Sequence, residues 1–262
     1  MPASHLPAKL HIPVFGKRIA YYDTGSGPAV VLVHGFDSEA RFDWGHVILP
    51  LAEHYRVLAL DQIGFGSSEK PSVDYCIQTF VDFLGEFLRT LNIYEFTLAG
   101  ESFGGWVSAL YTIESLAPDN TGPLALPRPQ RLILEDAAGL APLPPHPPVA
   151  MVFHDKSRVT EEFIRDVWGT KIRANEGSTE HALWGNPKTS TEVVSSRLDM
   201  ITVPTLVVWG DSDEIIPLAQ GRAYFEGIPG AKLSIIPECG HAPSIERPAE
   251  FLAAVLPFIQ GS

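Results

Sequence analysis

The stretch TLAGESFGGWVSALY, residues 97–111, decides the fold because it joins a strand, a tight turn and a helix. In its centre Ser102 lies between Gly100 and Gly104, which gives the pattern G-x-S-x-G. Neighbours without side chains allow a turn so tight that the serine hydroxyl is forced outward. We therefore predict a nucleophilic serine at the end of a strand, with the N–H of Phe103 facing it from the start of a helix. The alternative is an ordinary glycine-rich turn with an idle serine.

On both sides of this stretch, apolar runs typical of strands alternate with amphipathic segments of helical length. Strands are expected at 18–25, 29–35, 55–61, 96–100, 131–137, 205–211 and 232–238, and helices at 79–93, 103–116 and 248–259. Continuously apolar strands that alternate with helices predict an α/β protein, with a mostly parallel twisted sheet and helices on both faces. Such sheets bind ligands outside the carboxyl ends of their strands.

The alternation stops at the proline-rich run GLAPLPPHPPVAM, residues 139–151. After it, 157–172 is predicted to be a helix with Thr160 as its N-cap, and a second helix is expected at 191–200. We therefore predict two parts: an α/β core formed by 1–138 and 201–262, and a small helical lid, 139–200, inserted after the sixth strand.

A serine hydroxyl needs a base to become a nucleophile, and the base needs an acid that orients it. The segment WGDSDEIIP (209–217) places Asp213 just past a strand, and GHAPSIERP (240–248) places His241 past the last one. We predict a catalytic triad of Ser102, Asp213 and His241. Two other carboxylates stay open as the acid, Asp211 and Asp136.

These segments, together with VHGFDS (33–38), LDQIGFGSS (60–68) and GESFGG (100–105), resemble the α/β-hydrolase superfamily over nearly the whole chain, as in its serine carboxylesterases. The resemblance implies the α/β-hydrolase fold and selects Asp213 by the family pattern G-x-x-D. It also implies that the backbone N–H of Phe36 is the second oxyanion donor.

Related epoxide hydrolases and haloalkane dehalogenases carry an aspartate at the nucleophile position, where this chain has Ser102. We therefore predict hydrolysis of small to medium carboxylic esters through an acyl-enzyme, with no cofactor and no metal. Asp37 is a predicted substrate contact, although we favour a role in holding its loop by an Asx-type hydrogen bond. The other predicted substrate contacts are also open to a pure packing role; these are Met151, Phe153, Phe163, Trp168, Trp184 and Ile215.

A second reading is a carbon–carbon hydrolase of ring-fission diketones, because VFHDKSRVTEEFIRDVW (152–168) looks like the lid of those enzymes. They usually carry asparagine where this chain has Glu101 and tryptophan where it has Ala242, so we favour the esterase. In the family the side chain at the position of Glu101 usually turns away beneath the sheet, but we favour a hydrogen-bonded carboxylate that supports the site. A third reading is a ligand receptor with slow turnover.

The composition excludes several classes of protein. Hydrophobic residues make up 45% of the 262 and charged residues 19%, which indicates a globular chain. A net charge of -12 argues against nucleic-acid and anionic-membrane partners, which need a basic face. With only two cysteines and no leader-like start, we expect a cytoplasmic monomer or homodimer that acts on a small-molecule ester.

Overall fold

The computed structural model describes residues 6–142 and 148–261. Their strands form one sheet in the order β1-β2-β4-β3-β5-β6-β7-β8. The pairs β1·β2 and β2·β4 are antiparallel and all later pairs are parallel. The α/β fold class is confirmed. The strands are β1 (Leu10–Val14), β2 (Lys17–Thr24), β3 (Ala29–Val33), β4 (Arg56–Leu60), β5 (Phe96–Glu101), β6 (Arg131–Glu135), β7 (Thr205–Gly210) and β8 (Lys232–Ile236).

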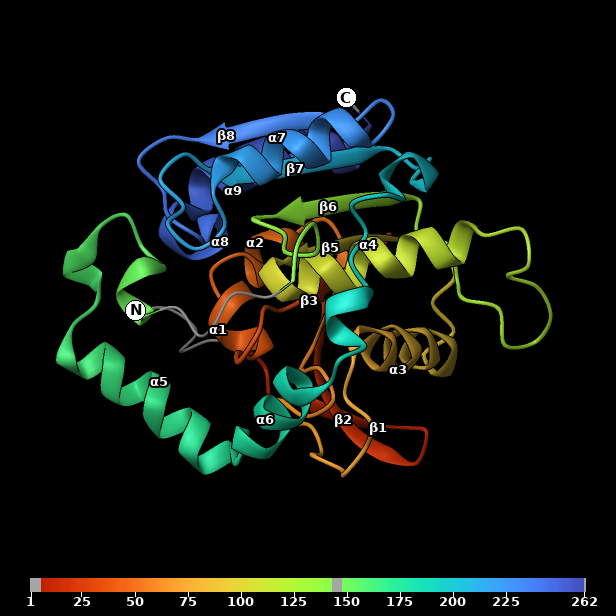
Figure 1. The fold of residues 1–262 in the computed structure, drawn as a ribbon, viewed down its shortest axis with the longest axis horizontal. Coiled ribbons are helices and arrows are strands. Elements are labelled where there is room, and N and C mark those ends of the chain that lie inside the picture. Colours follow the sequence, from red (N-terminus) through yellow and green to blue (C-terminus); the bar gives the residue numbers. More distant parts are fainter. Residues whose placement is uncertain (1–5, 143–147, 262) are drawn as a thin grey trace.

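The sheet separates two hydrophobic cores, because successive side chains of a strand point to opposite faces. In β3, Val31 and Val33 join one core, whereas Val30 and Leu32 join the other. The first core packs under helices α3 (Ile77–Thr90), α4 (Ser102–Leu116) and α7 (Leu218–Gly227). The second packs under α1 (Ala40–Trp44), α2 (Ile48–Ala52) and α9 (Pro248–Gln260), as the layers in Figure 1 show.

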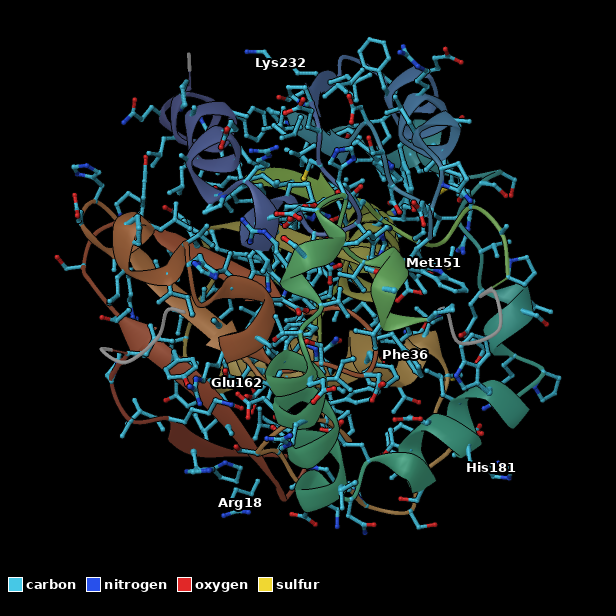
Figure 2. The ribbon with its side chains drawn as sticks, turned by 90° about the vertical axis from the view of Figure 1, so that its left-hand side faces the viewer. Arg18, Phe36, Met151, Glu162, His181 and Lys232 are labelled. Atoms are coloured by element: carbon cyan, nitrogen blue, oxygen red, sulfur yellow. The ribbon has the colours of Figure 1, made fainter. Side chains whose placement is uncertain are left out.

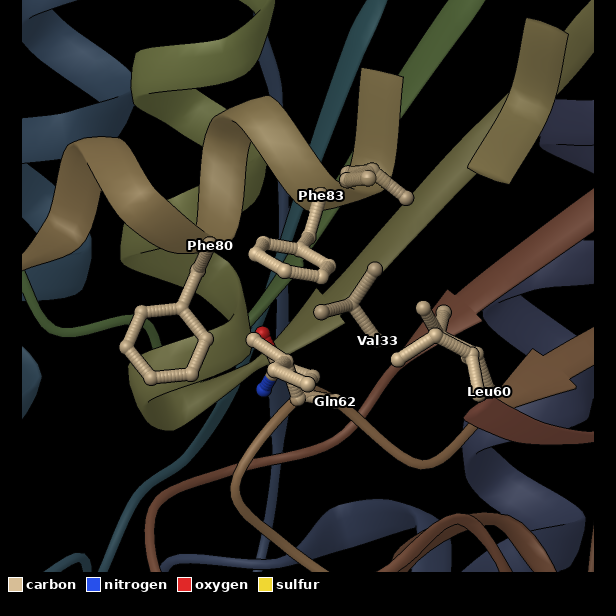
Figure 3. A pocket seen from close by; sticks show the side chains of 8 residues that line it. Val33, Leu60, Gln62, Phe80 and Phe83 are labelled. Atoms are coloured by element: carbon tan, nitrogen blue, oxygen red, sulfur yellow. The ribbon is translucent and has the colours of Figure 1, made fainter. Parts of the chain in front are cut away.

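The first core is closely filled where α3 crosses the ends of β3 and β4. A cavity of about 10 Å³ remains there, bordered by Val33, Leu60 and Gln62 and by two phenylalanines of α3. In Figure 3, Phe80 and Phe83 extend from the helix toward the strand residues. Since this volume is about that of one water-sized probe, the cavity offers no room for a substrate.

Between β6 and β7 the chain leaves the sheet as an insert, residues 139–200. It contains α5 (Glu161–Ala174), α6 (Gly177–Gly185) and the 3₁₀ turns η1 (Val149–Met151), η2 (Lys156–Arg158), η3 (Thr189–Thr191) and η4 (Leu198–Met200). In Figure 1 the arrowheads of β6 and β8 point toward the side on which α5 lies. Figure 2 looks onto that side, where the segment bearing Met151, Glu162 and His181 crosses in front of the sheet. The insert therefore lies beyond the carboxyl ends of the strands.

The structure confirms one of the two helices expected in the insert. Helix α5 matches 157–172, and its cap is Thr160, whose hydroxyl accepts the N–H of Phe163 at 3.0 Å. The helix expected at 191–200 is wrong, because the chain there is held by tertiary contacts: the N–H of Val194 donates to the carbonyl of Gly139 at 2.8 Å.

The elements that the sequence patterns missed include β1, α6 and α7. Strand β1 lies at the edge of the sheet and has mostly exposed side chains, so it carries no apolar run. Helix α6 has a low degree of amphipathicity, and its glycine at each end resembles a loop. None of the helices within 6–142 and 148–261 is long and apolar enough to cross a membrane.

Candidate active site

Ser102 lies at the junction of β5 and α4 with a backbone φ of 51°, a conformation that costs energy for any residue with a side chain. The glycines around it are required by close approach. A Cβ on Gly100 would collide with the carbonyl oxygen of Gly104, and a Cβ on Gly104 would collide with that of Val33. The predicted turn therefore exists, and the helix start is pressed against the end of β3.

The structure brings the three predicted triad residues together (Ser102, His241 and Asp213). The hydroxyl Oγ of Ser102 lies 2.8 Å from Nε2 of His241, and Nδ1 of His241 lies 2.8 Å from Oδ2 of Asp213. The other oxygen of Asp213 accepts the backbone N–H groups of Ile215 and Ile216 at 2.7 and 2.9 Å. With both of its oxygens accepting hydrogen bonds, Asp213 selects the imidazole tautomer that carries its proton on Nδ1, which leaves Nε2 to face the serine.

Asp213, rather than Asp211 or Asp136, is the carboxylate that is hydrogen-bonded to Nδ1 of His241. Burial alone would raise the pKa of Asp213, but the charge of His241 and the hydrogen bonds outweigh it, so the pKa is lowered. Asp211 is exposed and contacts Ser212. Asp136 is fully buried behind Asp213, with carboxylate and imidazole atoms of all three groups within 4.8 Å. Burial and then the charge of Asp213 raise the pKa of Asp136 well above its ordinary value.

Glu101 lies buried beside the triad. Its carboxyl oxygen Oε1 lies 3.6 Å from Nε2 of His241, and only 5% of the residue is exposed. Burial, followed by the nearby Asp43 and Glu135, raises the pKa of Glu101 well above its ordinary value. The site thus holds a buried carboxyl group with a raised pKa close to the nitrogen of His241 that faces Ser102.

The loop after β3 carries Phe36 and is fixed from beneath. The N–H of Gly35 donates to Asp43 at 2.7 Å, and the hydroxyl of Ser38 donates to the same carboxylate at 2.5 Å. Gly35 also lies against the Ser102 side chain, since a Cβ on Gly35 would be 3.3 Å from that of Ser102. The ring of Phe36 packs edge-on against that of Phe103, with centroids 5.8 Å apart. The two residues predicted to supply oxyanion donors are therefore neighbours beside the serine.

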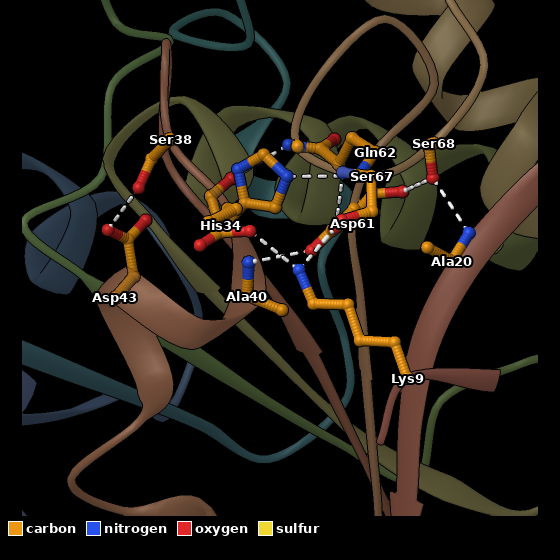
Figure 4. A network of polar contacts seen from close by, with 12 residues as sticks. Lys9, Ala20, His34, Ser38, Ala40, Asp43, Asp61, Gln62, Ser67 and Ser68 are labelled. Atoms are coloured by element: carbon orange, nitrogen blue, oxygen red, sulfur yellow. Dashed lines mark hydrogen bonds and ion pairs between the residues drawn. The ribbon is translucent and has the colours of Figure 1, made fainter. Parts of the chain in front are cut away.

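A buried polar network holds this loop from its other end (Figure 4). Lys9 Nζ lies 2.6 Å from carboxylate oxygens of both Glu39 and Asp61, and Asp61 also accepts the N–H of Ala40 at 3.0 Å. Burial works to lower the pKa of Lys9, yet the two acids raise it. Nε2 of His34 accepts the N–H of Gln62 at 2.9 Å, as the network in Figure 4 shows. The role of Lys9 was not visible in the sequence, because it lies far from every motif.

Helix α6 lies over the loop after β3, which carries Phe36 and is called the oxyanion loop from here on. The ring of Trp184 packs edge-on against that of Phe36 with centroids 5.5 Å apart. The carboxylate of Asp37 lies within 4.8 Å of those of Glu176 and Glu180, so it faces this helix. Trp184 and Asp37 are thus the two predicted substrate contacts that lie next to the oxyanion loop.

The other predicted substrate contacts are placed as follows. Phe153 is fully buried against Ala242 and Ile245, and Phe163 packs on it with ring centroids 5.5 Å apart. Met151 and Ile215 are partly buried, in η1 and beside Asp213 respectively, whereas the side chain of Trp168 lies outside the described residues. Contact of these residues with substrate stays a prediction.

An activated serine at the end of a central strand, with a histidine and an aspartate from later strand ends, defines a hydrolase of the α/β class. Residues 30–255 match the alpha/beta hydrolase family, and the chain belongs to that family.

The similar proteins include hydrolases of dienoic acids and an esterase. The chain is 27% identical over 257 residues to the 2-hydroxy-6-oxo-6-(2'-aminophenyl)hexa-2,4-dienoic acid hydrolase of Metapseudomonas resinovorans, which covers 93% of this chain and 88% of that protein. The fold matches that of 2-hydroxy-6-oxo-6-phenylhexa-2,4-dienoate hydrolase from Rhodococcus sp. strain RHA1, with a TM-score of 0.81, 22% identity and coverage of 97% and 98%. It also matches an esterase from Exiguobacterium antarcticum, with a TM-score of 0.76, 21% identity and coverage of 97% and 100%.

Proposed function

We propose that this hydrolase cleaves small to medium carboxylic esters through an acyl-enzyme on Ser102. The observation that supports the proposal most is the continuous chain of hydrogen bonds from Ser102 through His241 to Asp213, with both links at 2.8 Å. A serine held this way needs only an electrophilic acyl carbon above it and donors for the oxyanion.

The proposed reaction has two halves. Nε2 of His241 takes the proton of Ser102 while Oγ attacks the acyl carbon, and the oxyanion is held by the N–H groups of Phe36 and Phe103. His241 then passes its proton to the leaving alcohol as the C–O bond breaks, which leaves the acyl group on Ser102. In the second half His241 takes a proton from water, the hydroxide attacks the acyl group, and the proton returns to Ser102 as the acid leaves. Asp213 holds the imidazolium that forms in both halves.

The insert, residues 139–200, is proposed to act as a lid over Ser102 and the strand ends around it. Trp184 on the ring of Phe36 provides an apolar wall directly beside the oxyanion loop. The carboxylates of Asp37, Glu176 and Glu180 lie on the same side of the site. We expect the apolar wall at Trp184 to accept the acyl chain of the ester.

A series of p-nitrophenyl esters from acetate to decanoate tests the proposal, with Ser102→Ala measured in parallel as the blank. We expect turnover of the shorter esters by the wild-type protein and none above background by the variant, with unchanged circular dichroism. Turnover that survives in Ser102→Ala would rule out the proposed nucleophile.

Carbon–carbon hydrolysis of ring-fission diketones is the second candidate, and the relative from Metapseudomonas resinovorans favours it. The same triad would serve, but Glu101 and Ala242 occupy the positions at which the sequence departs from those enzymes. Ala242 is buried against Phe153, which leaves little space for a larger side chain. A ring-fission diketone assayed beside the esters decides between the two: kcat/KM higher for the diketone than for every ester would replace the esterase proposal.

A further inference from the structure

The insert is fastened to the loop that carries the catalytic base. After η1, the carbonyl of Val152 accepts the backbone N–H of His241 at 2.7 Å. The same carbonyl lies so close to Gly240 that a Cβ there would collide with it. Residue 240 must therefore be glycine for the chain entering the insert to reach the base.

A single carboxyl group completes this attachment. Glu246 belongs to the short helix α8 (Pro243–Glu246) and is only 3% exposed. Its oxygen Oε2 accepts the N–H of Gly240 at 2.7 Å and that of His154 at 3.0 Å, and Oε1 accepts the N–H of Asp155 at 2.7 Å. One side chain thus satisfies backbone donors from the base loop and from the insert at once.

Packing and a second side chain reinforce the same contact. Phe153 is fully buried against Ala242 and Ile245, in a small apolar cluster separate from the two main cores. From η2, Arg158 donates to the carbonyls of Ile245 and Glu246 at 3.4 and 3.2 Å. The attachment therefore has polar and apolar parts, and both join the entry of the insert to the residues that flank His241.

We propose that Glu246 is a positioning residue that braces the His241 loop against residues 152–155 of the insert, and so fixes the base relative to Ser102. This inference rests on the proposed function of the triad. Hydrogen bonds from a backbone N–H to a buried carboxyl group are strong, and they are costly to leave unmade. Loss of the brace would let the imidazole shift, and displacements on the order of 1 Å can cost roughly 100-fold in rate.

The first test is Glu246→Gln, which keeps the size of the side chain but presents an NH2 group to at least one N–H donor. We expect kcat for p-nitrophenyl butyrate to fall on the order of tenfold or more, with KM within about twofold of wild type. The matched control is Glu238→Gln on the same loop, whose carboxylate is exposed and contacts Arg247 at 3.3 Å. It should leave both constants unchanged.

The second test removes a donor from the insert instead of the acceptor. Asp155 has a φ of −78°, which suits proline, so Asp155→Pro deletes its N–H in a compatible backbone conformation. Asp155→Ala keeps that N–H and loses only the side chain. We expect kcat to fall in Asp155→Pro and not in Asp155→Ala, and this pair carries the test if Glu246→Gln does not fold.

A drop in thermal stability with wild-type kcat and KM at 20 °C below the transition would make Glu246 purely structural and overturn the inference. Equal losses of kcat in Asp155→Pro and Asp155→Ala would overturn it too. Failure of the proposed function has a different signature, because in that case Ser102→Ala would retain turnover whatever the Glu246 variants do.

Discussion

The catalytic floor and the insert above it are built in contrasting ways. The floor, meaning the loops and strand ends at the carboxyl ends of β3, β5, β6, β7 and β8, is held by close steric contacts and contains buried carboxyl groups such as Glu135 and Asp136. The insert exposes the acidic first turn of α5, Glu161 and Glu162, to solvent. One oxygen of Glu135 accepts the N–H of Ser244 and one oxygen of Asp136 accepts the N–H of Gly210, whereas the two glutamates of α5 lie at the surface.

The insert nevertheless reaches the core through a few specific polar contacts. Glu192 accepts the N–H of Ile77 at 2.6 Å, and its carbonyl accepts the indole N–H of Trp106 at 2.9 Å. Glu176 accepts the N–H of Gly66 at 2.6 Å. The comparison shows that the floor is fixed by close contacts among several strand ends, and that the insert reaches the core through individual hydrogen bonds.

The largest loss of ester hydrolysis should come from a substitution of Asp213, the carboxylate that is hydrogen-bonded to His241. Asp213→Asn replaces the acceptor that selects the tautomer of His241, and we expect kcat to fall on the order of 10⁴-fold in ester assays. Asp136→Asn should cost less than about tenfold, because an amide oxygen can still accept the N–H of Gly210. If Asp136→Asn proved the more damaging of the two, the acid would have been assigned to the wrong strand end.

Burial of carboxyl groups in the floor should appear as a pH dependence of stability. Burial raises the pKa of Glu135 from 4.5 to about 8, so the folded state keeps a proton that the unfolded state loses. Between these values the free energy of unfolding therefore falls as pH rises, by up to about 1.4 kcal/mol per pH unit from this group.

Glu135→Gln removes that dependence, so its unfolding free energy relative to wild type should increase from pH 5 to pH 8 by a few kcal/mol, on the order of the shift. Urea unfolding at several pH values measures it. The exposed Glu162→Gln in the insert is the control and should give a flat difference. A flat difference for Glu135→Gln as well would mean that this carboxyl group is not held neutral in the fold.

Replacing a glycine with alanine should change stability differently in the floor and in the insert, with smaller effects than the substitutions above. Gly104→Ala in the floor places a Cβ against the carbonyls of Val33 and His34, and we expect a loss of about 1–3 kcal/mol in thermal or urea unfolding. Gly177→Ala in the insert meets no atom within 4 Å and should be neutral or stabilising by about 0.4–1 kcal/mol. Equal changes in unfolding free energy for Gly104→Ala and Gly177→Ala would contradict the claim that Gly104 is sterically crowded and Gly177 is not.

The same distinction explains how much could be predicted from the sequence. The turn at Ser102 and the strand ends that carry Asp213 and His241 are encoded in short contiguous segments, so pattern and chemistry located the serine and the histidine, and the family resemblance selected Asp213 among the carboxylates. The direction of Glu101, the role of Lys9 and the brace at Glu246 were missed, because each depends on partners distant in the sequence. Residues 191–200 lost their expected helix for the same reason.

The measurement that tests the central claim most directly is intact-protein mass spectrometry of the wild-type protein, acid-quenched within milliseconds of mixing with p-nitrophenyl butyrate. The account predicts a transient mass increase of one butyryl group, located on Ser102 by peptide mapping, in step with a stoichiometric burst of p-nitrophenol. Rapid turnover with no adduct, or an adduct on another residue, would contradict an acyl-enzyme formed at the triad.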